Sequence, residues 1–305
     1  MTAPASTRAS ARPAPDGAPI DARSPTRHFA VGLARAVGGA LVFGLPLFMT
    51  MEMWELGFAM DRLRLALLLV VAVPFLVGLS HVSGFEETFD LTHDVVDAFV
   101  AVAVGFGVGA AVLALLGLLE PGMPAGEAIG KVALQAVPGS IGALLAQSQF
   151  GQRHDAGASD GEGASDGNGA AGRRPSTYAS QVFLMAVGAL FLAFNVAPTE
   201  EMSLISHLTT PWHGLAIAVV SLAVIHAFVY ALEFSGQETV PPGTPFHHTF
   251  LRFTVVGYAV ALLISAYVLW TFGRLDGLAW AERVTIVLVL GFPASLGAAA
   301  ARLLL

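Results

Sequence analysis

Long apolar runs separated by short polar segments extend over most of the chain. Each run approaches or exceeds the roughly 20 residues that an α-helix needs to cross the hydrocarbon core of a bilayer. The pattern predicts an all-α membrane protein with eight transmembrane helices. The predicted spans lie at about residues 33–59, 63–83, 95–119, 126–148, 179–207, 212–234, 249–273 and 280–304.

Two hydrophilic segments set the predicted domain boundaries. Residues 1–30 are rich in Ala, Pro, Arg and Ser and lack the apolar core of a signal peptide, so we expect a disordered cytoplasmic tail. Residues 151–177 are mostly Gly, Asp, Ser and Ala, the composition of a flexible linker that cannot pack. We therefore expect two membrane domains of four helices each, at residues 31–150 and 178–305.

Composition supports the membrane class and narrows the chemistry. Hydrophobic residues make up 55% of the chain and charged residues 12%, against about 25% charged in soluble domains. Formal net charge is −7, so a nucleic-acid partner is not expected. There is no cysteine, which excludes disulfides, thiolate catalysis and Cys-ligated metals. No enzyme signature is present, and we expect neither catalysis nor a cofactor.

Basic residues and tryptophans predict the orientation. With a cytoplasmic N-terminus, ten of the Lys and Arg residues fall inside and five outside, in line with the positive-inside rule. The four tryptophans then all fall at the outer interface, where indole rings favour the headgroup level. Residue usage, with a single lysine, suggests a GC-rich prokaryotic genome. We expect a multi-pass protein of a prokaryotic cytoplasmic membrane with both termini cytoplasmic.

The two predicted domains align with each other in sequence. Residues 39–53 match residues 188–202 at an offset of 149 without a gap, and residues 138–143 match 293–298 at an offset of 155. Each repeat has an even number of spans, so the two repeats should share one membrane orientation. This parallel arrangement occurs in transporters whose sites lie between repeats. The alternative is a duplication that serves assembly alone.

Carboxylates near the outer ends of the first and fifth predicted spans are the main candidates for a functional site. Glu52 and Glu201 occupy equivalent positions in the repeats, and a charge at membrane depth is costly, so such groups usually have a function. Prolines at 46 and 198 free backbone carbonyls nearby. These oxygens suit a cation or a shared proton; the alternative is snorkelling to the headgroups. The full candidate set is Glu52, Glu201, Glu200, Thr50, Thr199 and Asn195.

Other charged residues have more ordinary interpretations. Asp97 and Arg252 occupy equivalent positions and predict a structural ion pair between the repeats. Lys131 is expected either to neutralise Glu52 or Glu55 or to snorkel. His226 is either a packed histidine or part of a proton relay. His and acidic residues in the cytoplasmic loops leave a metal site open, although their spacing matches no helical metal-binding motif.

The segments Ala-Pro-Thr-Glu-Glu at 197–201 and Thr-Met-Glu-Met-Trp at 50–54 resemble those of an uncharacterised prokaryotic family of integral membrane proteins, a domain of unknown function. The resemblance covers about residues 30–305 and implies a multi-span protein. It brings no known ligand or catalytic residue. The residues themselves favour a cation- or proton-linked transporter or channel, against a non-transporting sensor or assembly protein. The implied partners are the lipid bilayer and a cation or proton, with homo-oligomer formation left open.

Overall fold

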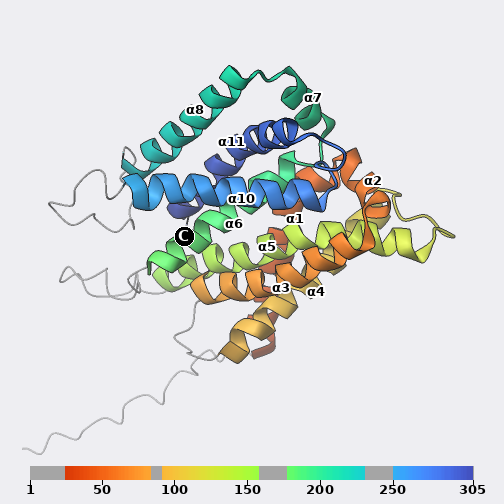
Figure 1. Cartoon of the computed structure of the whole chain (residues 1–305). Helices are drawn as coiled ribbons and strands as arrows, with labels where there is room; N and C mark the ends of the chain where they lie inside the picture. Colours follow the sequence, from red (N-terminus) through yellow and green to blue (C-terminus); the bar gives the residue numbers. More distant parts are fainter. Residues whose placement is uncertain (1–24, 84–90, 158–176, 231–249, 305) are drawn as a thin grey trace, which may run out of the picture.

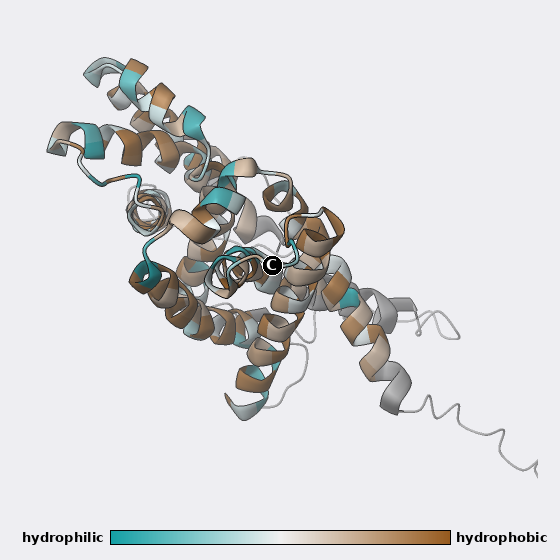
Figure 2. Ribbon diagram, turned by 90° about the vertical axis from the view of Figure 1, so that its right-hand side faces the viewer, coloured by the Kyte–Doolittle hydropathy of each residue, from teal (hydrophilic) through white to brown (hydrophobic). Residues whose placement is uncertain are grey.

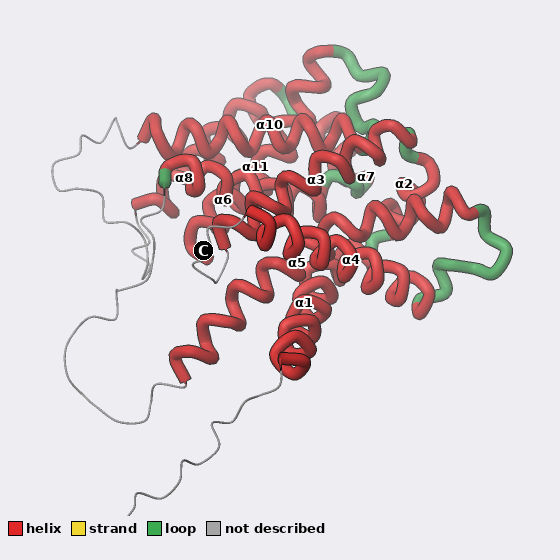
Figure 3. Tube along the Cα trace, turned by 90° about the horizontal axis from the view of Figure 1, so that it is seen from below, coloured by secondary structure: helices red, strands yellow, loops and turns green. Residues whose placement is uncertain are grey.

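A computed structural model describes residues 25–83, 91–157, 177–230 and 250–304, and every regular element within these ranges is a helix (Figures 1 and 3). The predicted tail and linker fall largely outside the described residues. Where the described residues overlap the predicted tail and linker they are helical, because α1 begins at Pro25 and α5 continues to Gly157. The elements are α1 (Pro25–Phe48), α2 (Met51–Ala59), α3 (Arg62–Ser83), α4 (Leu91–Leu115), α5 (Ala125–Gly157), α6 (Tyr178–Val196), α7 (Glu200–Leu208), α8 (Pro211–Tyr230), η1 (Phe250–Val255), α10 (Val256–Thr271) and α11 (Trp280–Leu304).

Within the described residues, eight helical spans are long and apolar enough to cross a membrane, which confirms the prediction of an all-α membrane protein with eight spans. Six are α1, α3, α4, α5, α6 and α8; the π-helical η1 and α10 form the seventh span, and α11 is the eighth. Large apolar side chains face outward along them, such as Leu63 at 80% exposure and Val42 at 70%. Hydrophobic residues predominate along the helices (Figure 2). Because lipid solvates such surfaces, the chain is a multi-pass integral membrane protein.

Two of the predicted spans, 33–59 and 179–207, were wrong as single helices. In each case the helix stops and a short helix of nine residues follows, α2 after α1 and α7 after α6. Thr50 and Thr199, the residues before the short helices, have extended backbones with ψ of 114° and 148°. Pro198 lacks the N–H that would continue α6. The transmembrane parts therefore end at Phe48 and Val196.

Two helices form the centre of the bundle. The spans of α5 and α11 are 72% and 56% buried, more than those of the other six. α5 contacts α1, α2, α3 and α4, and α11 contacts α6, α7, α8 and α10. Glycines allow the closest approaches, as small residues do between membrane helices. A Cβ on Gly39 would meet the Gly142 carbonyl, and a Cβ on Gly188 would meet the Gly297 carbonyl.

These contacts divide the molecule into a first half, α1–α5, and a second half, α6–α11 (Figure 1). The two halves meet along a narrow seam, where α3 contacts α6 and α10, and α5 contacts α6. Aromatic pairs cross this seam. The ring centroids of Phe43 and Phe191 are 5.0 Å apart, and those of Phe75 and Phe183 are 5.1 Å apart. Each half therefore packs mainly around its own central helix.

Candidate functional site

The break between α1 and α2 is held by side-chain hydrogen bonds to the last carbonyls of α1. The Thr50 hydroxyl donates to the Pro46 carbonyl at 2.7 Å, and the indole N–H of Trp54 donates to the Phe48 carbonyl at 2.8 Å. Between them, Nε2 of the buried Gln135 of α5 donates to the Leu47 carbonyl at 3.1 Å. These bonds satisfy carbonyls that a helix end leaves without partners.

The break between α6 and α7 is satisfied in a related way. The Thr199 hydroxyl donates to the Val196 carbonyl at 3.0 Å, and Asn195 donates through Nδ2 to the Phe191 carbonyl at 2.8 Å. The guanidinium of Arg274, from the turn after α10, donates to the Pro198 carbonyl. Asn195, Thr50 and Thr199 thus use their hydrogens to close the helix breaks, while their side-chain oxygens can still accept.

The candidate carboxylates lie on the first turns of the short helices, beyond the ends of the spans. Glu52 of α2 is partly buried, whereas Glu200 and Glu201 of α7 are exposed. Carboxylates at helix N-termini interact favourably with the helix dipole. Within the described part of the chain, none of the three has a hydrogen-bond or ion-pair partner. α2 packs on α5 and α7 on α11, so the structure brings the carboxylates to one end of the molecule (Figure 1) without pairing Glu52 with Glu201.

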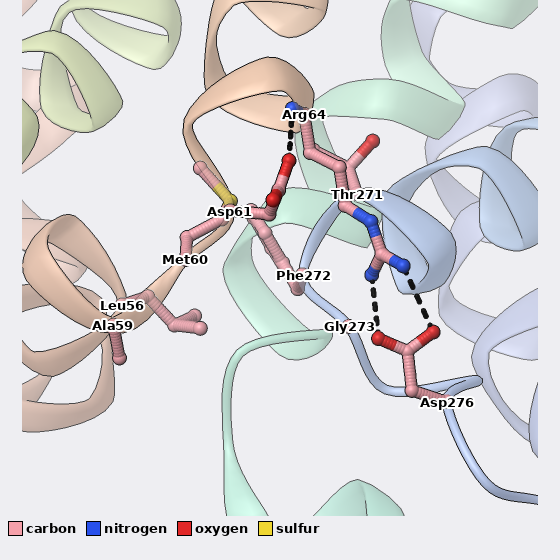
Figure 4. A pocket seen from close by; sticks show the side chains of 9 residues that line it. All are labelled: Leu56, Ala59, Met60, Asp61, Arg64, Thr271, Phe272, Gly273 and Asp276. Atoms are coloured by element: carbon pink, nitrogen blue, oxygen red, sulfur yellow. Dashed lines mark hydrogen bonds and ion pairs between the residues drawn. The ribbon is translucent and has the colours of Figure 1, made fainter.

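A pocket of about 470 Å³ opens at this same end, where the two halves meet (Figure 4). We call it the seam pocket. The end of α2 and the start of α3 form one wall, and the end of α10 and the following turn form the other. The lining residues are Leu56, Ala59, Met60, Asp61, Arg64, Thr271, Phe272, Gly273 and Asp276.

An ion pair crosses the seam at this pocket. Nη1 and Nη2 of Arg64 donate to Oδ2 and Oδ1 of Asp276 at 2.8 and 3.0 Å, a two-point contact between the halves. Nη1 also donates to the Trp270 carbonyl at 2.9 Å, and the guanidinium lies 5.1 Å from the centre of the Trp270 ring. Gly273 and Gly277, with φ of +73° and +74°, fold the turn that carries Asp276. Hydrogen bonding to Arg64 lowers the pKa of Asp276 below its ordinary value.

The third charged residue of the pocket caps a helix. Oδ1 of Asp61 accepts from the backbone N–H groups of Leu63 and Arg64 at 2.9 and 3.1 Å, at the start of α3. Two carboxylates and one guanidinium give the seam pocket a formal charge of −1. Since Arg64 is already engaged by Asp276, the local balance favours a cationic ligand over an anionic one.

The sequence did not point to this pocket. Arg64 is one of the five basic residues predicted to lie outside the membrane, and Asp276 belongs to none of the predicted sites. Their pairing joins residues 212 positions apart, which no local pattern reveals. The one local signal is the pair of glycines around Asp276, which marks a tight turn between two predicted spans.

Two other charged residues of the sequence analysis have contacts in the structure. The Arg252 guanidinium lies 4.3 Å from the centre of the Tyr178 ring, within its own half; its ion pair with Asp97 stays a prediction. Lys131 is buried and pairs with Glu127 of the same helix at 2.7 Å, rather than with Glu52 or Glu55.

The loops in which the sequence leaves a metal site open include residues 84–90 and 231–249, which lie outside the described residues. Nδ1 of His81 lies 2.8 Å from Oδ2 of Asp94 where α3 and α4 approach this end. No group of three or more His, Asp or Glu side chains with metal-binding geometry occurs in residues 29–82, 91–146, 177–228 and 250–301.

No curated protein and no solved structure matches the chain. One family model matches residues 32–305, nearly the whole chain outside the predicted tail. The chain therefore belongs to the family described as "Putative integral membrane protein (DUF2391)".

Proposed function

We propose that this protein is a transporter coupled to a cation or a proton, and that the seam pocket is the outer mouth of its path. The observation that carries the proposal is the pocket itself. It lies between two separately packed halves, it is lined from both, and it has a formal charge of −1 from two carboxylates and one guanidinium. Sites between structural units that move against each other are typical of secondary transporters.

The packing supports relative motion of the halves. Within each half, glycine contacts hold the outer helix close against the central one, as between Gly39 and Gly142 or Gly188 and Gly297. The seam between the halves is much thinner. The two glycine pairs are related by the same offsets, 149 and 155 residues, that relate the two sequence repeats. This correspondence supports the proposed duplication. In the proposed transport cycle, one half rocks against the other.

The carboxylates on the short helices have a supporting role in this proposal. Glu52, Glu200 and Glu201 lie at the same end as the seam pocket, without lining it. Carboxylates around an entrance raise the local concentration of cations, an effect that salt screens. They therefore affect capture of the ion more than its binding. The hypothesis from the sequence, in which Glu52 and Glu201 themselves bind the ion, predicts a different result. One experiment distinguishes it from binding in the seam pocket.

The experiment is ion flux into liposomes containing the purified protein, tested with protons and a panel of monovalent and divalent cations. Asp276→Asn and Arg64→Met are expected to change flux of the transported ion at least tenfold at any ionic strength. Glu52→Gln/Glu201→Gln is expected to reduce flux only at low salt. Glu120→Gln is the matched control, because Glu120 is exposed in the α4–α5 loop and lies outside the pocket.

Two outcomes would change the assignment. Loss of flux at high salt in the Glu52→Gln/Glu201→Gln variant, with Asp276→Asn unaffected, would move the binding site to the short helices. Absence of flux for every tested ion in folded wild-type protein would refute transport. It would favour the alternative, a membrane sensor or assembly protein.

A further inference from the structure

Helices η1 and α10 carry a series of buried hydroxyl groups. Thr254 and Ser265 are fully buried, Thr271 is 1% exposed and Tyr258 is 8% exposed. Ser221 of α8, also fully buried, lies beside the Tyr258 hydroxyl. In a lipid-exposed bundle, buried polar groups tend to mark ion or proton pathways.

This series nearly spans the membrane. The 17 residue-to-residue steps from Thr254 to Thr271, at 1.5 Å each, cover about 25 Å, against a hydrocarbon core of about 30 Å. At one end, Thr271 lines the seam pocket. At the other end, the Thr254 hydroxyl lies 3.2 Å from Nδ1 of His226 on α8. The hydroxyls therefore form a discontinuous series from the pocket to a histidine near the opposite end of the molecule, with steps of about 9–10 Å on either side of Ser265.

Two tyrosine hydroxyls on this helix have no hydrogen-bond partner in the described protein, although both oxygen atoms are buried. The neighbouring hydroxyls are directed elsewhere. Ser221 donates to the Ile217 carbonyl at 2.8 Å, and Thr271, beside Tyr267, donates to the Tyr267 carbonyl at 2.8 Å. An unsatisfied buried hydroxyl costs about 1–3 kcal/mol, and a bound water molecule removes that cost. The Ser221 and Thr271 oxygens beside Tyr258 and Tyr267 can still accept a hydrogen bond, so either a small shift of the tyrosine hydroxyls or a bridging water would satisfy them.

The corresponding helix of the first half lacks this feature. Under the proposed duplication, the offset of 155 places Phe99, Ala103, Ala110 and Leu116 of α4 and the following loop opposite Thr254, Tyr258, Ser265 and Thr271. All four are apolar. Packing of this helix in a repeat therefore does not require hydroxyl groups, and their presence on α10 alone points to a task that only the second half performs.

We propose that the buried hydroxyls of η1 and α10 conduct protons between the seam pocket and His226. This inference rests on the proposed transport function and names the proton as the ion that moves. Each hydroxyl oxygen accepts a proton from a bridging water on one side and releases its own proton to the water on the other side. His226 takes up a proton at one ring nitrogen and releases one from the other, as imidazole does in proton shuttles. No net bond change remains after the groups reorient.

The surroundings of His226 suit a transfer step. Its ring packs edge-on against Phe250, with centroids 5.3 Å apart, and Thr254 bonds to Nδ1. The elements packed against α8 contribute few ionisable residues. They are Arg252 of η1, Tyr258 and Tyr267 of α10, and Glu282, Arg283 and Arg302 of α11. Glu282 and Arg283 start α11 at the opposite end from His226, and the Arg252 guanidinium stacks on Tyr178. No carboxylate of these elements therefore lies near the histidine.

The test is proton uptake into liposomes containing the full-length protein, driven by a potassium diffusion potential and followed with a pH-sensitive dye. Tyr258→Phe/Ser265→Ala removes two hydroxyls and keeps the ring and the packing volume. Its uptake rate is expected to fall at least tenfold. Ser140→Ala removes a buried hydroxyl from α5 in the first half, where it bonds to the Ala136 carbonyl at 2.6 Å. That control is expected to stay within twofold of wild type.

The outcomes separate this inference from the proposed function. Wild-type uptake by Tyr258→Phe/Ser265→Ala would overturn the α10 path while leaving transport standing. Flux of a metal cation without proton uptake in wild type would do the same. If the double variant fails to purify as a folded protein, Tyr267→Phe alone serves, with an expected loss of at least threefold. An unchanged rate in that variant would also overturn the path. Absence of all flux would refute the transport function and with it this inference.

Discussion

Replacing Asp276 by Asn should weaken the contact between the two halves by a measurable amount. The Arg64–Asp276 pair is bidentate, but the two side chains are 22% and 59% exposed, so solvent screens their attraction. Exposed ion pairs contribute about 0.2–1 kcal/mol, and bidentate geometry belongs at the upper end of that range. We therefore expect a coupling energy between Arg64 and Asp276 of about 0.5–1 kcal/mol in a double-mutant cycle with Arg64→Met.

The pH dependence gives this prediction a second signature. Arg64 lowers the pKa of Asp276 in the folded protein. A lowered carboxyl pKa stabilises the folded state above the unfolded pKa, about 3.9, and this stabilisation disappears as pH falls through the lowered value. Wild type and Asp276→Asn should therefore differ in stability at neutral pH and converge in acid.

The assay is reversible unfolding in mixed detergent micelles, followed by tryptophan fluorescence. Glu127→Gln is the control, because it breaks the Glu127–Lys131 pair within α5 and leaves the seam intact. It should show no coupling with Arg64→Met. A coupling energy between Arg64 and Asp276 indistinguishable from zero at neutral pH would show that the ion pair does not hold the halves together.

Further predictions concern the packing within the first half. Gly142→Ala should destabilise the protein by about 1–3 kcal/mol, because the added Cβ would lie 2.5 Å from the Gly39 carbonyl oxygen. Gly107→Ala, with no neighbouring atom within 4 Å, should be neutral or stabilising by up to about 1 kcal/mol; equal thermal unfolding of the two variants would contradict this account of the helix contacts. Gln135→Leu should leave stability equal or up to about 1 kcal/mol higher in chemical unfolding, since it removes a buried amide oxygen without a partner; a large loss would show that the bond to Leu47 is worth more than this.

The number of membrane spans and their helical structure could be predicted from the sequence because lipid requires each span to satisfy its own backbone hydrogen bonds. That requirement makes long apolar runs a strong signal. The helix breaks were less accessible. Prolines at 46 and 198 indicated them, but whether a helix continues past a proline depends on side chains elsewhere. Gln135 and Arg274 donate hydrogen bonds to carbonyls at the two breaks, and neither lies near them in sequence.

The candidate site was predicted only in part. Symmetry between the repeats drew attention to Glu52 and Glu201, and the structure does bring their short helices to one end of the molecule. The symmetry of the sequence could not show that the pocket at this end is lined by other residues. Arg64 and Asp276 come together only when the halves are assembled, so their pairing is a property of the tertiary structure.

The central claim is that the two halves move against each other around the seam pocket, and a reversible cross-link tests it most directly. The chain contains no cysteine, so Phe75→Cys/Phe183→Cys introduces the only two thiols. The rings of this pair lie 5.1 Å apart across the seam, and neither residue lines the seam pocket. Ion flux is measured in liposomes before treatment, after reaction with a short, membrane-permeant bis-methanethiosulfonate, which joins the two thiols through disulfides and releases sulfinate, and after reduction. The account predicts flux before treatment, loss of flux on cross-linking, and recovery on reduction. Flux that continues unchanged while the two halves are fully cross-linked would contradict it.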